Sequence, residues 1–71
     1  MTNRNELRAA VARKGLTMGE LAEKIGIGIA SMSNKANGRM DFRASEIERI
    51  AEVLDLNYKD IGIIFFAKHV D

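Results

Sequence analysis

Two short helical segments separated by about three residues constrain this chain more than any other feature of its sequence. Thr17 and Glu20 form a T-x-x-E capping box, in which each side chain satisfies a backbone N–H group that the first helical turn leaves unpaired. We expect a helix over residues 18–25 after this box and a second helix over residues 29–36. Two helices joined by a tight turn that contains glycine form a helix-turn-helix.

Glycine rather than proline separates the helical segments, because the chain has six glycines and no proline. Gly15, Gly26 and Gly38 each follow a helical pattern, at the position where a left-handed residue commonly ends a helix. We therefore expect a first helix over residues 4–14, with Asn3 as its N-cap.

A fourth helix is predicted beyond a loop at residues 39–43. Apolar residues recur at positions i, i+3, i+4 and i+7 over residues 44–54, which is the spacing of one helical face. Ser45 and Glu48 offer a second capping box at its start.

Asn57 and Asp60 predict the start of a short fifth helix over residues 58–63. The apolar tail of residues 63–70 either continues this helix or extends as a strand, because periodicity does not separate the two. The predicted fold class is therefore all-α, with five helices and an apolar tail of undetermined conformation.

Length and composition exclude several classes of protein. A chain of 71 residues makes one domain, residues 1–71, and is too short for a deep, enclosed active site. The absence of cysteine excludes disulfides and thiolate metal sites, and suits the cytoplasm. Charges within the first 14 residues argue against a signal peptide, and the apolar run 61–67 is too short to cross a bilayer.

The net charge of +1 conceals an asymmetry along the chain. Residues 1–43 carry eight bases and four acids, whereas residues 44–71 carry three bases and six acids. One end of the molecule therefore faces a polyanion, or the charges are segregated by chance on a solvated surface.

The side chains that most enzymes and metal sites require do not occur together in this sequence. His69 is the sole histidine, so neither a metal site nor a triad with Ser31 or Ser33 can be completed. Glu46 and Glu48 are two residues apart, hence on different helical faces, and we expect both to be solvated. We expect no enzyme, no cofactor, no membrane association and no small-molecule substrate.

The run KGLTMGELAEKIGIGIASMSNKANG resembles the helix-turn-helix of the phage repressor and Cro family, which is also called XRE-like. The run EIERIAEVLDLNYKDI is similar to the fourth and fifth helices of that family. The resemblance covers residues 4–63. It implies a compact, repressor-like bundle that places the helix at residues 29–36 in the DNA major groove.

The resemblance also implies which residues meet DNA, because phosphate contacts give affinity and base-edge contacts give specificity. The implied base-edge residues are Ile29, Ala30, Ser33 and Asn34. The implied phosphate-facing residues are Thr17, Met18, Asn37, Arg39 and Arg43.

The sequence departs from the family pattern at the residues expected to read DNA. Met18 stands where glutamine is common, and Ile29 and Ala30 open a helix whose first residues are usually polar. These apolar side chains can touch a thymine methyl group but cannot form hydrogen bonds with a purine. Asn34 is the best remaining reader, because its amide can pair with N6 and N7 of adenine.

Two placements of Ile29 are consistent with the sequence. With Met32 and Ala36 it falls at i, i+3 and i+7, which would form a stripe in the core. Facing outward, it would instead join Met18 and Ala30 in an apolar patch, a feature more typical of surfaces that bind proteins.

Val11 and Ala36 stand where some relatives bury an Arg–Glu pair. Because both members are apolar here, the replacement leaves no unpaired buried charge. We expect the core to fold normally around them.

The apolar tail allows two interpretations. Ile64, Phe65 and Phe66 either close the small core of the monomer or form a surface for self-association. A homodimer would suit the second interpretation, since a monomer of this size reads only a short half-site.

Two functions from different classes follow. The leading prediction is a cytoplasmic, phage-type transcriptional regulator that binds double-stranded operator DNA through residues 29–36. The alternative is an antirepressor or modulator that keeps the fold but binds a partner repressor through the face of the two helices and prevents its DNA binding. Ile29 and Ala30 discriminate between these predictions.

Overall fold

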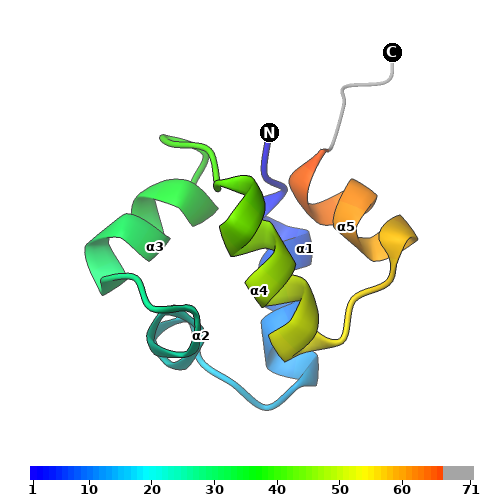
Figure 1. Cartoon of the computed structure of the whole chain (residues 1–71), viewed down its shortest axis with the longest axis horizontal. Coiled ribbons are helices and arrows are strands. Elements are labelled where there is room, and N and C mark those ends of the chain that lie inside the picture. The colour runs from blue at the N-terminus through cyan, green and yellow to red at the C-terminus, as the bar shows by residue number, and fades with distance from the viewer. Residues whose placement is uncertain (67–71) are drawn as a thin grey trace.

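The structure is a computed structural model that describes residues 1–66. These residues form five helices, and Figure 1 shows how short loops join them. The helices are α1 (Arg4–Arg13), α2 (Met18–Ile25), α3 (Ile29–Ala36), α4 (Ala44–Leu54) and α5 (Tyr58–Phe65). Within residues 1–66 no strand occurs. The all-α class and the five helices predicted from the sequence are confirmed.

Side-chain caps determine where three of the helices begin. Asn3 caps α1, and Thr17 and Glu20 form the predicted reciprocal box at α2, with hydrogen bonds of 2.9 and 3.1 Å. Asn57 and Asp60 make the same arrangement at α5, at 2.8 and 3.2 Å. Each cap satisfies backbone N–H groups that have no partner within the helix, so these starts could be read from the sequence.

The predicted capping box at the start of α4 is wrong. The N-cap is Arg43 rather than Ser45, and the carboxylate of Glu46, not that of Glu48, accepts a hydrogen bond from the N-cap N–H group at 2.7 Å. Glu46 takes this role because it also meets a lysine of α3, whereas Glu48 is exposed to solvent.

Helix α5 continues two residues beyond the predicted end, so an extended strand is wrong for residues 63–65. The residues before α1 cap the last turn of α5. The N–H of Asn3 donates to the carbonyl oxygen of Ile64 at 2.6 Å, and the ammonium group of Met1 donates to the carbonyl oxygen of Phe65 at 3.3 Å. The remainder of the predicted tail, including His69, lies outside the described residues.

The helices pack in two groups that share α1 and α4 as neighbours (Figure 1). Helix α2 contacts α1, α3 and α4, while α5 contacts α1 and α4 from the other side. In Figure 1, α2 is seen nearly end-on and α3 lies across the view, so the axes of this pair cross steeply.

Gly26 ends α2 at φ +79°, a left-handed conformation that glycine adopts without steric cost.

The core draws residues from all five helices. Its members are Leu7, Ala10, Val11, Leu21, Ala22, Ile25, Met32, Ala36, Phe42, Ile50, Leu54, Ile64 and Phe65. The expected core positions of Met32 and Ala36 are confirmed. Phe42, from the loop before α4, meets Phe65 edge-on with ring centroids 5.4 Å apart.

Of the two interpretations of the tail, closure of the monomer core applies to Ile64 and Phe65, so a self-association surface formed by these two residues is wrong. Their side chains are only 2% and 4% exposed, because the last turn of α5 packs inward and Phe65 contacts Phe42. Phe66, the third residue of that set, is 58% exposed.

The edge-on aromatic pair predicts a large effect of one truncation. Phe42→Ala should lower the free energy of unfolding by about 3–5 kcal/mol, since it removes a buried ring and leaves a cavity beside Phe65. Phe66→Ala, the same change at an exposed ring, should alter it by less than about 0.5 kcal/mol. Urea unfolding followed by circular dichroism measures both, and equal effects would contradict the core described here.

Candidate nucleic-acid interface

Helix α3 is fixed to α4 by a buried ion pair. The Lys35 ammonium group donates to both carboxylate oxygens of Glu46 at 2.7 Å, and each side chain is 8% exposed. The same carboxylate accepts the N–H of Arg43. Because both carboxylate oxygens of Glu46 accept from Lys35 and one also accepts from the backbone of Arg43, the pair sets the position of α3 relative to the loop that follows it.

The expectation that Glu46 is solvated is therefore wrong. Sequence spacing showed only that Glu46 and Glu48 lie on different faces of α4, not which of the two faces α3. A basic residue in the last turn of α3 and an acidic residue in the first turn of α4 were the available signal. That signal becomes specific only when the path of the intervening loop is known.

The charge state of Glu46 depends on these partners. Burial favours the protonated form and by itself raises the pKa of Glu46. The hydrogen bonds from Lys35 and from the backbone of Arg43, together with the charges of both residues, outweigh burial and hold this pKa below its usual value of 4.5. The folded structure therefore favours the ionised carboxylate.

The opposite face of α3 is open to solvent. Ile29 is 59% exposed, and Ala30 and Ser33 are exposed beside it. Packing of Ile29 in the core is therefore wrong: the residue begins the helix, and the buried stripe starts at Met32. Met18 is half-buried and packs against the edge of the core.

Asn34 is held in place by the loop after α3. Its carbonyl oxygen accepts the backbone N–H of Arg39 at 2.9 Å, and its side-chain oxygen accepts a hydrogen bond from the Arg39 guanidinium at 3.3 Å. An amide oxygen has two lone pairs, so Asn34 can still accept from a second donor while its NH₂ group donates. The side chain therefore keeps the donor and acceptor that pairing with adenine requires.

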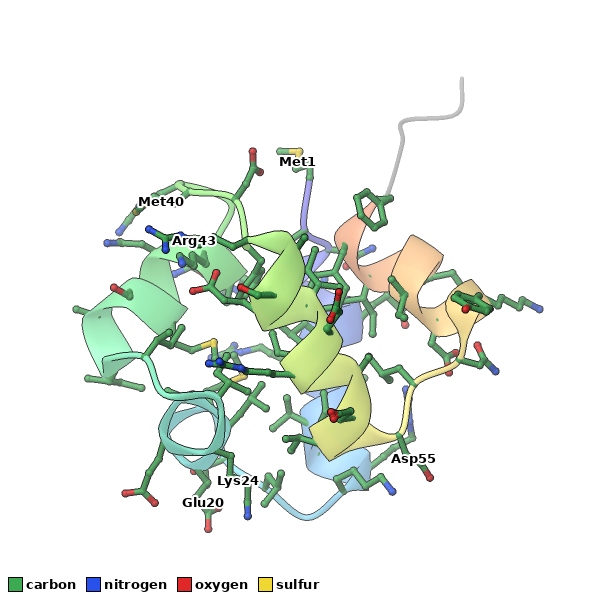
Figure 2. All side chains as sticks on the ribbon, viewed as in Figure 1. Met1, Glu20, Lys24, Met40, Arg43 and Asp55 are labelled. Carbon is green, nitrogen blue, oxygen red and sulfur yellow. The ribbon has the colours of Figure 1, made fainter. Side chains whose placement is uncertain are left out.

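Basic residues of the loop lie where α3 ends and α4 begins. Arg39 and Arg43 are both exposed there, and Figure 2 shows Arg43 beside Met40 at this end of α3. Asn37, the C-cap of α3, is exposed, and its NH₂ group donates to the Ser33 hydroxyl oxygen at 3.3 Å.

The amino end of α2 carries a negative charge of its own. The carboxylate of Glu20 accepts the N–H of Thr17, so an anion already occupies this helix end. Met18 follows and offers no hydrogen-bond donor. Figure 2 shows Glu20 and Lys24 at the end of the molecule opposite to Met40 and Arg43.

A groove of about 200 Å³ lies beside α3, between that helix and α1. Its lining residues are Arg4, Arg8, Met18, Ile29, Met32, Ser33, Ala36 and Asn37. The sequence predicted a role for several of these residues, but it gave no reason to single out Arg4 and Arg8 on α1.

Comparison with known families matches residues 6–65 to the Cro/C1-type HTH DNA-binding domain. The chain belongs to this family. Comparison with curated proteins finds no significant match. The match agrees with the geometry, because α2 and α3 form the helix-turn-helix and α3 exposes its outer face.

The Cro/C1-type domain is a DNA-binding domain of transcription regulators, and its family is not one of enzymes. In residues 1–66, none of the helices combines the length and the apolar character needed to span a membrane. The roles of individual residues at the DNA remain predictions.

The buried ion pair makes the stability of this Cro/C1-type domain depend on pH. The pKa of Glu46 is lower in the folded state than in the unfolded state. The ionised carboxylate therefore contributes its full stabilisation above about pH 4.5, and this stabilisation is lost as the pH falls through the pKa of the folded state. The free energy of unfolding should therefore fall more steeply in wild type than in Glu46→Gln between about pH 6 and about pH 3.

Urea unfolding at each pH measures this difference. Glu48→Gln is the matched control, because it removes an exposed carboxylate from the same helix and should leave the acid-induced loss unchanged. Identical pH dependence in wild type and Glu46→Gln would refute the role of the pair.

Proposed function

We propose that this Cro/C1-type domain is a phage-type transcription regulator that reads operator DNA with α3 in the major groove. The observation that carries the proposal is the fixed, outward-facing surface of α3, with Ser33 and Asn34 beside the basic loop. The buried pair of Lys35 and Glu46 supports it, since a helix held in one orientation reads bases without an ordering cost at each encounter.

Each part of this surface has a separate role in the proposal. Asn34 pairs with adenine, and Ile29 and Ala30 contact thymine methyl groups. Arg39 and Arg43 contact phosphates on the loop side of α3, where they supply affinity that is independent of sequence. The backbone of the other DNA strand passes three further residues, Thr17, Met18 and Asn37. Thr17 and Asn37 can form hydrogen bonds with it, whereas Met18 contributes only packing.

The protein acts as a homodimer in this proposal. A single α3 covers only a short half-site, and two copies related by a two-fold axis would read half-sites about one helical turn of DNA apart. Exposed apolar side chains at the end of α5, Ile63 and Phe66, support self-association at that end.

Selection of duplexes from a random DNA library at about 100–150 mM salt tests the proposal, because non-specific phosphate binding is already weakened in this range. Enrichment of a motif with two-fold symmetry is the expected result. Failure of folded protein to enrich any motif would overturn operator reading by α3.

Asn34→Ala should weaken binding to the selected site by about 1–3 kcal/mol and relax the preference for adenine at one position of each half-site. The variant loses the amide that pairs with the base but keeps the buried contacts of α3. Asn5→Ala, at an exposed asparagine of α1, is the control and should bind as wild type does. A fluorescence anisotropy titration with matched and mismatched duplexes measures both, and unchanged discrimination by Asn34→Ala would exclude Asn34 as a base reader.

A second candidate function rests on the exposure of Ile29. An apolar residue that is 59% exposed at the start of α3, next to Ala30 and Met18, is suited to a protein partner. In this alternative the protein is an antirepressor that covers the DNA-binding face of a repressor.

Ile29→Asp should abolish capture of a co-expressed Cro/C1-type repressor, because the complex would then bury an unpaired carboxylate. Tyr58→Asp introduces the same charge at an exposed residue of α5 and should leave the complex intact. Isothermal titration with the purified repressor quantifies both variants. Undiminished binding by Ile29→Asp would remove this face as the contact.

A further inference from the structure

We propose that the groove between α1 and α3 binds a backbone phosphate of DNA, and that Arg4 and Arg8 supply the positive charge. This inference rests on the proposed DNA-binding function. It assigns the contacts on the side of α3 that lies away from the basic loop.

The two arginines lie on one face of α1. They stand four positions apart, so their side chains emerge about one helical turn apart and line the same groove. Both are exposed, and among residues 1–66 neither forms an ion pair or a side-chain hydrogen bond. Their guanidinium groups are therefore available to an anion that approaches the groove.

The opposite wall of the groove offers neutral polar groups. Ser33 and Asn37 lie one turn apart on α3 and line the groove together with Ile29. The Ser33 hydroxyl oxygen accepts from Asn37, which leaves its own O–H group to donate. No carboxylate lines the groove, so its charge is uniformly positive.

The groove and the basic loop contact α3 at different positions around its axis, because Ser33 and Asn34 lie about 100° apart on the helix. Residues 29, 33 and 37 repeat at four-residue spacing along the groove, whereas Asn34 turns toward Arg39 in the loop. A helix in the major groove runs between two phosphate backbones, so cations on both sides fit this position.

The amino end of α2 cannot supply the missing cation on the groove side. Glu20 places a carboxylate at this helix end, outside the groove lining, and Met18 has no donor. Arg4 and Arg8 are the bases among the residues that line the groove, which makes them the source of affinity on that side. DNA is favoured over an acidic peptide because the groove adjoins the exposed face of α3 along its length.

The test uses the full chain and a duplex of mixed sequence, because phosphate contacts do not depend on base identity. The logarithm of the binding constant is plotted against the logarithm of salt concentration between about 50 and 200 mM. Arg4→Gln and Arg8→Gln should each reduce the slope by about 1, and the double variant by about 2. Arg8→Lys should retain most of the wild-type slope.

Arg13→Gln is the matched control, because it removes the same charge from α1 at a position outside the groove. Its slope should stay within error of wild type, and urea unfolding verifies that all variants are folded. A slope for Arg8→Gln equal to that for Arg13→Gln would overturn the inference.

The outcome also separates this inference from the proposed function. Loss of slope in Arg39→Gln alone, with Arg4→Gln and Arg8→Gln unchanged, would leave DNA binding intact and refute the groove as a phosphate site. Absence of duplex binding by folded wild type would overturn both. Binding of an acidic peptide that Arg8→Gln abolishes, with an unchanged DNA slope, would assign the groove to a protein partner and refute the DNA contact.

Discussion

The ion pair between Lys35 and Glu46 is the interaction on which the candidate interface depends. A buried pair of this kind contributes little net stability, because desolvation offsets much of the attraction, but loss of one member leaves a buried charge without a partner. Its value here is geometric. The carboxylate of Glu46 accepts hydrogen bonds from Lys35, in the last turn of α3, and from the N-cap N–H of α4. It therefore joins the two ends of the loop that carries Arg39 and Arg43. The exposed face of α3 and the basic loop are consequently tied to the same carboxylate.

Local chemistry made most of the fold predictable from the sequence. The caps at Asn3, Thr17 and Asn57 are interactions between residues three apart in the chain, and the glycine at the end of α2 is a requirement of a single backbone position. The end of α5 was not predictable in this way, because its last turn is capped by the lead-in to α1. The burial of Glu46 and the groove beside α1 likewise depend on residues brought together only by tertiary packing.

The outer face of α3 explains why the same fold supports two candidate functions. Ile29 and Ala30 present apolar surface at the end of the helix that would enter the major groove first, while Asn34 retains both hydrogen-bonding groups. Apolar contacts recognise thymine methyl groups and also the surfaces of proteins, so this part of the helix does not discriminate between the two ligands. Charge does discriminate between the two ligands, because the arginines beside α3, in the basic loop and on α1, favour a polyanion.

The hydrogen bond between Asn3 and Ile64 joins the two segments of the described chain that lie farthest apart in sequence. A helix of eight residues has little stability by itself, so α5 persists through its packing and through this tie to the lead-in of α1. Truncation at one side of the chain therefore weakens the other. Removal of the first three residues would expose the carbonyl groups at the end of α5 and loosen Phe65 against Phe42, although Phe65 lies far from the deleted residues in the sequence.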